Sequence, residues 1–477
     1  MPWGEGGEGQ VAALGKLCNR VALRGIVRTG RVSRATAKSD QFSPALAYMP
    51  RQSGGGEGFQ GFEFAGATIY CGTYRKYSDF GMPISLSGGK RGKAMFSIRY
   101  FPDFSVLPST CVPLLESVGR DGLFGDPEWF AYLMRRMFDA SDALRLYVVE
   151  ESASGRPLLL APLRFSTVDA AVPGARVIGS ISHPENYAVM ALGFDQSVAD
   201  PLAVLVALFS HLRTGGAGSE APCDVLRLWP VEANSARTET VFAAMRRSGF
   251  WIQSYANSYN RFETTSGMSY EAYLAGRSAN HRYNIRRRHR ALEKAGTMEL
   301  VLYRDQADLG EAVGDYVAVS MASWKSPPTM IAPATLELIE LAARKGCLRL
   351  GILRVDGVAA AAQFWIVTAG VAHCARLAYR EDYRQLAVGV VLTNFMIAHV
   401  LDQDHVDRID FGYGDDAYKG GWMKDSRHYF GFMAFNPSTR RGRLQGLLHI
   451  LGRPIKRAIK FLLIRAGIRR PDSPESS

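Results

Sequence analysis

The stretch that decides the fold is LRLGILRV-DG-VAAAAQFWIV, residues 348–367. Two apolar runs of strand length flank Asp356-Gly357. This dipeptide is typical of the two-residue turn of a β-hairpin, because both of its positions adopt positive φ. We therefore predict antiparallel strands over Leu348–Val355 and Val358–Val367.

The segments around this hairpin alternate between strand and helix. Upstream we predict one strand and two helices, over Met298–Tyr303, Asp308–Ser323 and Pro333–Arg344. Downstream we predict a strand, an apolar helix and a last strand, over Val371–Ala378, Val388–Leu401 and Arg408–Phe411. Such alternation of strands and helices indicates an α/β fold.

A similar order of elements occurs earlier in the chain. A helix with Pro127 in its first turn is followed by a predicted hairpin, a helix and a strand, over Leu144–Glu150, Pro157–Phe165, Pro201–Arg213 and Val225–Trp229. We therefore expect a mixed α/β fold of two similarly built domains, residues 95–262 and residues 263–436.

Composition bounds the class of protein. The 477 residues are 47% hydrophobic and 21% charged, which is typical of a globular protein. The formal net charge of +12 would suit an anionic partner such as a nucleic acid, a lipid surface or a phosphorylated substrate. The six cysteines form no CxxC pair or zinc-like cluster, so we expect neither structural zinc nor a disulfide scaffold.

The two ends of the chain differ from the middle. Residues 1–94 are rich in Gly, Ser and Arg without sustained periodicity, so we expect a disordered extension or a start codon at Met82 or Met95. Residues 437–477 form a basic tail with leucines at helical spacing. With neither a signal sequence nor a membrane span in sight, we expect a cytoplasmic protein.

This tail has two interpretations. Its leucine stripe could lie at an anionic membrane surface, which would make the protein peripheral on the inner face of the membrane. Alternatively, the stripe could dock on the protein body and leave the charges in water. Nucleic-acid binding by the tail is a third, weaker interpretation, because few aromatic residues there could stack on bases.

One candidate site is the segment Tyr383–Val390, which joins a predicted strand to an apolar helix. Small residues at Ala387 and Gly389 would let a ligand approach the backbone at the helix N-terminus, where free N–H groups favour a phosphate. Arg384 could add a charge-assisted hydrogen bond. The alternative is a loop whose small residues serve close packing only.

A second candidate site follows the last predicted strand, at residues 410–419. Two glycines, three carboxylates, two tyrosines and a lysine crowd this strand end. Ligands of open α/β sheets bind at such ends. Turn formation alone would also explain the two glycines.

Three further features carry weaker signals. Trp324 and Lys325, after a predicted helix, could line a pocket or simply pack and be solvated. His373 lies on a predicted strand, where we expect a core histidine more than a catalytic base. The basic helix within residues 280–290 presents arginines either to water or to an anion, whether a substrate or RNA.

Together these segments resemble the GNAT superfamily, in particular its branch related to the cellulose-biosynthesis protein CelD. The resemblance rests on the basic helix Asn280–Glu293, Ser323-Trp324-Lys325, the hairpin and the segment Asp410–Lys419 with Trp422. It covers residues 268–422 best.

The resemblance implies a GNAT fold, an acyl-CoA such as acetyl-CoA as co-substrate without a metal, and acyl transfer to an amine. The family's pyrophosphate loop, Q/R-x-x-G-x-G/A, places the donor at Arg384, Gln385, Ala387, Val388 and Gly389, with Ala387 replacing a glycine. A backbone N–H of a splayed strand, here Val358–Val367, would polarise the thioester carbonyl. The second domain would carry this donor site.

The roles of the other site residues follow from what acyl transfer needs. A carboxylate should accept the amine proton, and we expect Asp415 in this role, with Asp410 as another candidate. Tyr418 and Lys419 would bind the acceptor, with Trp324 and Lys325 beside it.

Two alternatives to this acyltransferase remain. One is a tRNA-dependent aminoacyl transferase of the FemAB type, which shares the doubled architecture. The other is a non-catalytic binding or scaffolding member of the fold. We do not expect nucleic acid as the main partner, and the polysaccharide or cell-envelope pathway is implied by the family alone.

Overall fold

The computed structural model describes most of the chain beyond residue 94. The described ranges are 95–120, 122–168, 170–181, 191–216, 220–307, 309–323 and 331–449, together with the short antiparallel strands β1 (Phe62–Phe64) and β2 (Ala67–Ile69). The rest of the expected extension 1–94 and the part of the tail beyond residue 449 lie outside these residues.

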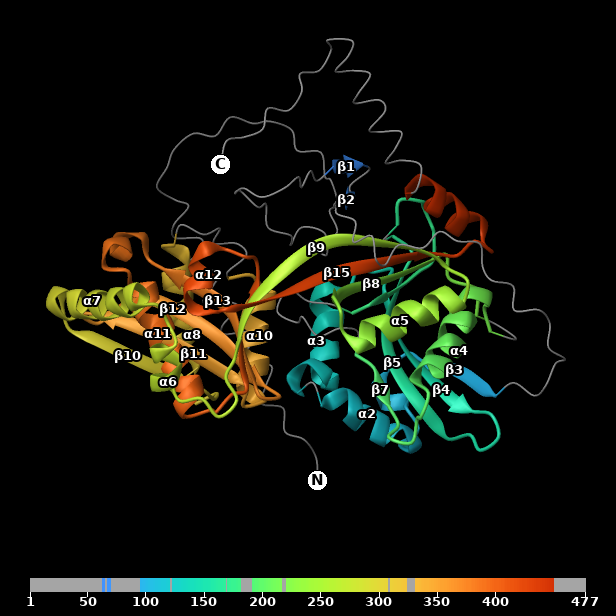
Figure 1. Ribbon diagram of the computed structural model, residues 1–477, viewed down its shortest axis with the longest axis horizontal. Coiled ribbons are helices and arrows are strands. Elements are labelled where there is room, and N and C mark those ends of the chain that lie inside the picture. The colour runs from blue at the N-terminus through green and yellow to red at the C-terminus, as the bar shows by residue number, and fades with distance from the viewer. Residues whose placement is uncertain are drawn as a thin grey trace, which may run out of the picture.

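The first half of the molecule carries helices on both faces of a sheet (Figure 1). Its strands are β3 (Phe96–Phe101), β4 (Ala143–Glu151), β5 (Pro157–Ser166), β6 (Val177–Ser180), β7 (Gly193–Phe194) and β8 (Val225–Glu232). Its α-helices are α2 (Val112–Gly119), α3 (Pro127–Met137), α4 (Pro201–Thr214) and α5 (Ala236–Arg247). Asp126 caps α3 by accepting a hydrogen bond from the Glu128 N–H, as the Asp-Pro start predicts.

The second half repeats this plan. Its strands are β10 (Met298–Tyr303), β11 (Leu348–Val355), β12 (Val358–Thr368), β13 (Val371–Tyr379) and β14 (Arg408–Tyr413). Its α-helices are α6 (Tyr270–Ala275), α7 (Ala279–Ala295), α8 (Leu309–Met321), α10 (Pro333–Arg344), α11 (Val388–Asp402) and α12 (Ala417–Trp422). The expected mixed α/β fold of two similarly built halves is confirmed, and so is the hairpin around Asp356-Gly357.

Two long strands, β9 (Trp251–Thr264) and β15 (Asp425–Phe435), join the halves. The described residues form one 13-stranded sheet of order β10-β11-β12-β13-β14-β9-β15-β8-β6-β5-β4-β3, with β7 beside β5. β9 follows the first half in sequence but pairs with β14 of the second, and β15 follows the second half but pairs with β8 of the first. The halves have therefore exchanged strands, and Figure 1 shows both strands arching from one half to the other.

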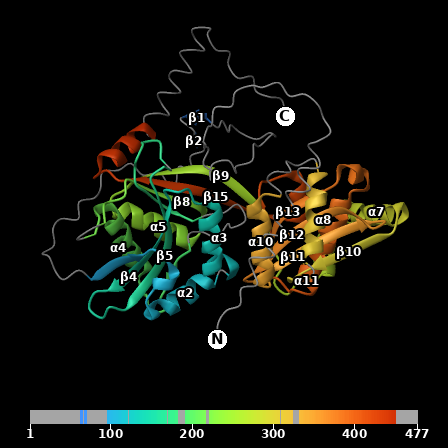
Figure 2. The ribbon, with the colours of Figure 1, turned by 180° about the vertical axis from the view of Figure 1, so that it is seen from behind.

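The core follows the same division. On one face of the sheet, α2 and α3 of the first half and α8 and α10 of the second share one apolar cluster. Figure 2 shows α3 beside α10 at this junction, where the Tyr132 hydroxyl donates to the Ala334 carbonyl at 3.1 Å. On the other face, α4 and α5 cover the first half, whereas α7 and α11 cover the second.

The basic tail begins as the helix 440–449. Its buried residues are Gly442, Gln445 and Gly446, and the Gln445 side chain accepts a hydrogen bond from the Val172 N–H at 2.9 Å. Leu444, Leu447 and Leu448 are 49%, 44% and 52% exposed. For these three leucines, docking on the protein body is therefore wrong: the glycines allow close packing, and the leucines face outward.

Candidate functional site: a parting of two parallel strands

Strands β13 and β14 run parallel but pair over three residues only, Val371–His373 with Arg408–Asp410. Beyond this point β13 continues along β12, and β14 continues along β9. The register of β13 against β12 also shifts at Ala375, which is the mark of a β-bulge. Within the described residues, no strand pairs with this edge of β13 beyond His373, so the two strands part at this point.

From the sequence, the free N–H was expected on Val358–Val367, which is strand β12. β12 pairs along its length with β11 on one side and with β13 on the other. Its N–H groups are used by these ladders, so the assignment of the splayed strand to Val358–Val367 is wrong. The parting lies one strand further along the sheet, at the outer edge of β13.

The loop between β13 and α11 lies beside this parting. It consists of a 3-10 helix, η7 (Glu381–Leu386), and Ala387, whose backbone is left-handed with φ of 53°. A glycine would adopt this conformation without strain, and glycine is the residue of the family pattern at this place. No side chain caps α11. The N–H groups of Ala387 and Val390 donate to the carbonyls of Arg384 and Ala387, so those of Val388 and Gly389 are the ones that can meet an anion.

The other residues of this loop differ in exposure. Arg384 is exposed and donates to Glu381 Oε1 at 3.0 Å. Gln385 is also exposed, and its carbonyl accepts a hydrogen bond from Arg288 Nη1 of α7 at 3.2 Å. Val388 and Gly389 are buried, and a Cβ on Gly389 would lie 3.4 Å from the Tyr379 ring. The side chain at 389 therefore has little room, while 384 and 385 face water.

Tyr418 connects α12 to α11 across the site. Its hydroxyl lies 3.0 Å from Thr393 Oγ1, which donates to the Gly389 carbonyl at 2.8 Å. The buried amide of Gln363 donates to the same threonine oxygen at 2.7 Å. Although 44% of Tyr418 is exposed, its hydroxyl is desolvated, and this desolvation raises the pKa of the phenol. At neutral pH Tyr418 is therefore a proton donor.

Asp410 lies at the last paired position, opposite His373. It is 6% exposed and accepts hydrogen bonds from the Gly412 N–H at 2.7 Å and from Asn260 Nδ2 at 3.3 and 3.4 Å. Burial lowers the pKa of His373, partly offset by Asp410, so this histidine is neutral. Its Nδ1 has no hydrogen-bond partner, and its ring packs edge-on against Phe124 of the first half. The ring therefore contributes to the contact between the halves.

Asp415 and Lys419 flank the turn after β14. The Asp415 carboxylate is about half exposed and accepts a hydrogen bond from Arg261 Nε of β9. The Lys419 amine donates to the Tyr413 carbonyl and, at 3.3 Å, to the Gly412 carbonyl. Burial lowers the pKa of Lys419. The lysine thus already has protein acceptors, while one side of the Asp415 carboxylate faces water.

Sequence reasoning missed the contribution of β9. Asn260 and Arg261 reach Asp410 and Asp415 from a strand about 150 residues away in the chain, and no local pattern marks them. Thr393 and Gln363 were missed because each lies within an apolar run that indicates core. Trp324 and Lys325 lie outside the described residues.

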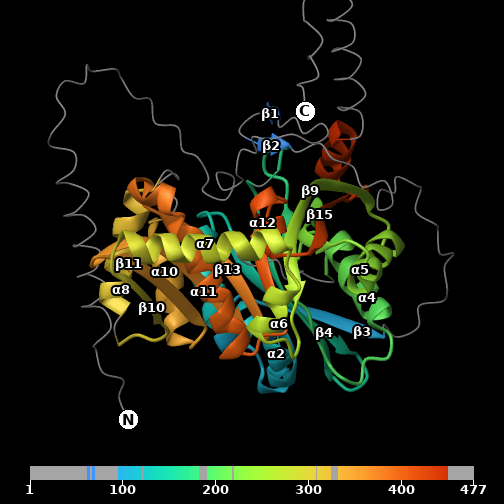
Figure 3. The ribbon, with the colours of Figure 1, turned by 60° about the vertical axis from the view of Figure 1, so that its left-hand side comes forward.

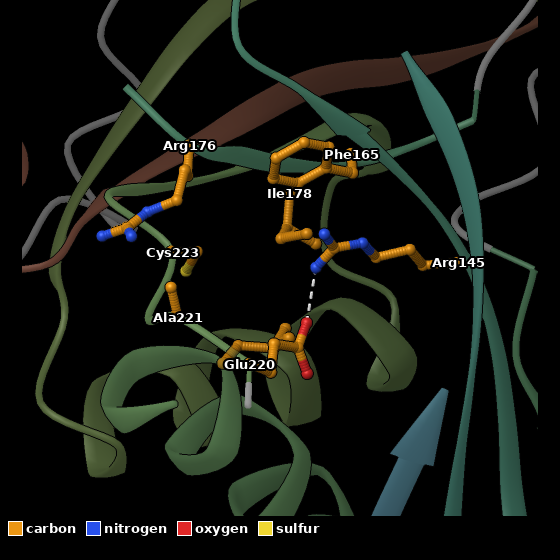
Figure 4. A pocket seen from close by; sticks show the side chains of 8 residues that line it. Arg145, Phe165, Arg176, Ile178, Glu220, Ala221 and Cys223 are labelled. Atoms are coloured by element: carbon orange, nitrogen blue, oxygen red, sulfur yellow. Dashed lines mark hydrogen bonds and ion pairs between the residues drawn. The ribbon is translucent and has the colours of Figure 1, made fainter. Parts of the chain in front are cut away.

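In the first half, β6 and β8 also run parallel and pair over three residues, Val177–Gly179 with Val225–Arg227. The polar cluster of this half surrounds Glu220, which accepts hydrogen bonds from Arg145 and Tyr147 and lies 2.9 Å from His211 Nε2. Figure 4 shows Arg145 and Arg176 around a cavity of about 10 Å³, room for a single water molecule. This cluster holds β4 to α4 and leaves no space for a cofactor.

Within the described residues, no cluster of three or more His, Cys, Asp or Glu side chains could hold a metal ion. In the same residues, no helix has the length and apolar character needed to cross a bilayer.

Residues 279–420 match the family model of the acetyltransferase (GNAT) domain. The matched region contains α7, the η7–α11 loop, the parting of β13 from β14 and Tyr418. This part of the second half is therefore similar to the GNAT acetyltransferase domain. No curated protein matches the chain in sequence.

Solved structures similar to this chain include a tandem GNAT protein from the clavulanic acid biosynthesis pathway, at 13% identity over 72% of this chain and 100% of that one, with a TM-score of 0.39. FemX is 9% identical over 60% of this chain and 88% of its own, with a TM-score of 0.38. A GCN5-related N-acetyltransferase from Sphaerobacter thermophilus is 11% identical over 72% and 98%, with a TM-score of 0.32.

Proposed function

We propose that the protein transfers an acyl group from acyl-CoA to an amine. The observation that supports this most directly is the parting of β13 from β14 beside the uncapped start of α11, inside the region that matches the acetyltransferase domain. A thioester can lie where β13 parts from β14, while the pyrophosphate of its CoA meets N–H groups at the start of the helix.

The donor would be held by Arg384, Gln385, Ala387, Val388 and Gly389. The backbone N–H groups of this segment would supply most of the contacts, because Val388 and Gly389 are buried. Arg384 can leave Glu381 for a phosphate at little cost, since an exposed ion pair contributes at most about 1 kcal/mol.

The chemistry has two proton transfers. The acceptor nitrogen attacks the thioester carbonyl carbon, the carbon–sulfur bond breaks, and the acyl group stays on nitrogen. Asp415, or Asp410 if the acceptor reaches deeper, takes the proton that nitrogen loses. Tyr418, whose raised pKa keeps the phenol protonated at neutral pH, gives its phenolic proton to the departing thiolate. Lys419 keeps the turn that positions these groups, and Trp324 and Lys325 would line the acceptor side.

Calorimetric titration with CoA tests the donor assignment. The protein should bind CoA, and Gly389→Glu should abolish binding because a long charged side chain against the Tyr379 ring would displace the loop. Gly389→Ala should bind nearly normally because its Cβ meets ordinary contact distances. Arg384→Glu repeats the test at an exposed position where folding is not at risk. Normal CoA binding by both Gly389→Glu and Arg384→Glu would refute the loop assignment.

The same titration addresses the alternatives. Retardation of tRNA in a gel without any CoA binding would favour an aminoacyl transferase. Absence of binding to either ligand would favour a non-catalytic module. From the resemblance we place the chain in the CelD-related branch, in the cytoplasm, with an acceptor from polysaccharide or cell-envelope metabolism. Mass spectrometry of acylated products lost in a deletion strain tests that acceptor.

A second proposal concerns the helix 440–449, which we assign to an anionic membrane surface. Leu444, Leu447 and Leu448 are exposed on one face, and Arg440, Arg441 and Arg443 are exposed beside them. An exposed apolar stripe flanked by basic residues is what binding to an anionic lipid surface requires.

A further inference from the structure

Helix α7 lies across the second half with one face buried. Ile285 and Leu292 are its buried apolar residues and pack into the core with α11. At 100° per residue, one flank of this buried face carries Asn284, Arg287 and Arg288, and the other carries Arg282, Arg286 and His289. Figure 3 shows α7 in front of α11 and β13, with α12 near one of its ends.

Contacts show which structures the two flanks face. Arg288 Nη1 donates to the carbonyl of Gln385, in the loop that would hold the pyrophosphate. Arg282 Nη1, on the other flank, donates to the carbonyls of Ala275 and Arg277 at 2.9 and 2.7 Å. The flank with Arg287 and Arg288 is therefore the one that borders the donor loop.

The start of α7 meets the other side of the site. The His281 ring packs edge-on against Trp422 of α12, with ring centroids 4.6 Å apart. His281 and Arg288 are two helical turns apart, so this face of α7 extends from α12 to the start of α11.

This flank carries uncompensated charge. Arg287 is exposed, and among the described residues no carboxylate pairs with Arg287 or Arg288. The single acid of α7, Glu293, lies 3.3 Å from His289 on the opposite flank. Two arginines that form no ion pair within the described residues, next to the loop that would hold the pyrophosphate, can bind a second anion.

We infer that Arg287 and Arg288 bind the 3′-phosphate on the ribose of CoA. This rests on the proposed function, because it places the nucleotide end of the same donor. Arg288 contacts the loop that would hold the pyrophosphate, and guanidinium groups hold phosphate through paired hydrogen bonds. Recognition of this phosphate would let the enzyme distinguish CoA from thioesters and nucleotides that lack it.

The test compares CoA with 3′-dephospho-CoA by calorimetric titration. The protein should bind CoA at least tenfold more tightly than 3′-dephospho-CoA. In the variant Arg287→Gln/Arg288→Gln, CoA binding should fall to the level of 3′-dephospho-CoA, whose own affinity should not change. Arg286→Gln, an exposed arginine on the opposite flank, is the matched control and should keep the full preference.

Each other outcome has a distinct meaning. Equal affinity of the wild-type protein for both ligands would overturn this inference and leave the proposed function standing. Absence of binding by either ligand would overturn both. If the double variant kept the tenfold preference, the phosphate would bind elsewhere. Retardation of tRNA that the double variant abolishes, without CoA binding, would assign this flank to RNA.

Discussion

The side-chain amide of Asn260 lies 3.3 and 3.4 Å from the two carboxylate oxygens of Asp410. Asn260 lies on β9, which follows the first half in sequence, and Asp410 lies on β14 of the second half. The carboxylate nearest the strand parting is thus oriented by the exchanged strand. A single half, without β9, would lack this contact and the Arg261–Asp415 pair.

We predict that Asp415→Asn lowers the rate of acyl transfer by about 10²-fold or more and leaves CoA affinity unchanged, because a proton acceptor is lost without a donor contact. Steady-state kinetics and CoA titration measure the two effects. Asp416→Asn, at a neighbouring and more exposed carboxylate, is the control and should retain its rate. Unchanged turnover in Asp415→Asn would move the role to Asp410.

For Tyr418 we expect a complementary result. Tyr418→Phe removes the phenolic proton while keeping the ring, so kcat should fall by about 10²-fold and CoA affinity should stay the same. Transfer from an activated thioester, whose thiolate needs less protonation, should suffer less. A uniform loss with both donors would show that Tyr418 acts through its hydrogen bond with Thr393 instead.

His373 should make stability depend on pH. Burial lowers the pKa of His373 below its usual value of 6.5. As the pH falls through 6.5, His373 binds a proton in the unfolded chain but not yet in the folded protein. The free energy of unfolding therefore decreases. His373→Phe should therefore lose less stability than wild type between pH 7.5 and pH 5.5 in denaturant titrations. Parallel losses in the two proteins would contradict this.

The buried pair Arg277–Glu263 should be important for stability. Both side chains are at most 5% exposed, and Arg277 also donates to the Trp422 carbonyl at 2.6 Å. Arg277→Met would leave Glu263 charged and buried, so we expect a loss of about 3–5 kcal/mol in the free energy of unfolding. The exposed pair Arg156–Glu151 is the control, because Arg156→Met should cost less than about 1 kcal/mol. Similar losses in the two variants would contradict this account.

The sequence predicted the elements whose patterns are local. The bounds of β10, β11 and α10 agree with the expected ranges, because apolar periodicity, Asp-Gly and Pro at a helix start mark them. The two exchanged strands, β9 and β15, were not predicted. Polar residues such as Asn260 and Arg261 do not alternate regularly with apolar residues along these strands. Each strand pairs with other strands on both sides and reaches into both halves, so contacts distant in the sequence decide which side chains are buried.

The candidate site was predictable only in part. The loop at Ala387 follows a short motif and the turn after Asp410 is dense in polar residues, so both were found from the sequence. The parting of β13 from β14 depends on where a parallel pair stops, which no residue pattern marks. For that reason the expected splayed strand, Val358–Val367, was β12 and not its neighbour β13.

The last prediction concerns the helix 440–449. Each basic residue near an anionic surface contributes about 1 kcal/mol, and each buried leucine about 1.5–3 kcal/mol. The protein should therefore sediment with anionic vesicles, less so at high salt, and not with neutral ones. Leu444→Ser/Leu447→Ser/Leu448→Ser should abolish this without changing the melting temperature, since all three are exposed. Val112→Ser, at an exposed valine of the first half, is the control and should bind normally. Equal sedimentation of the triple variant would refute the assignment, because the membrane contact would then lie elsewhere.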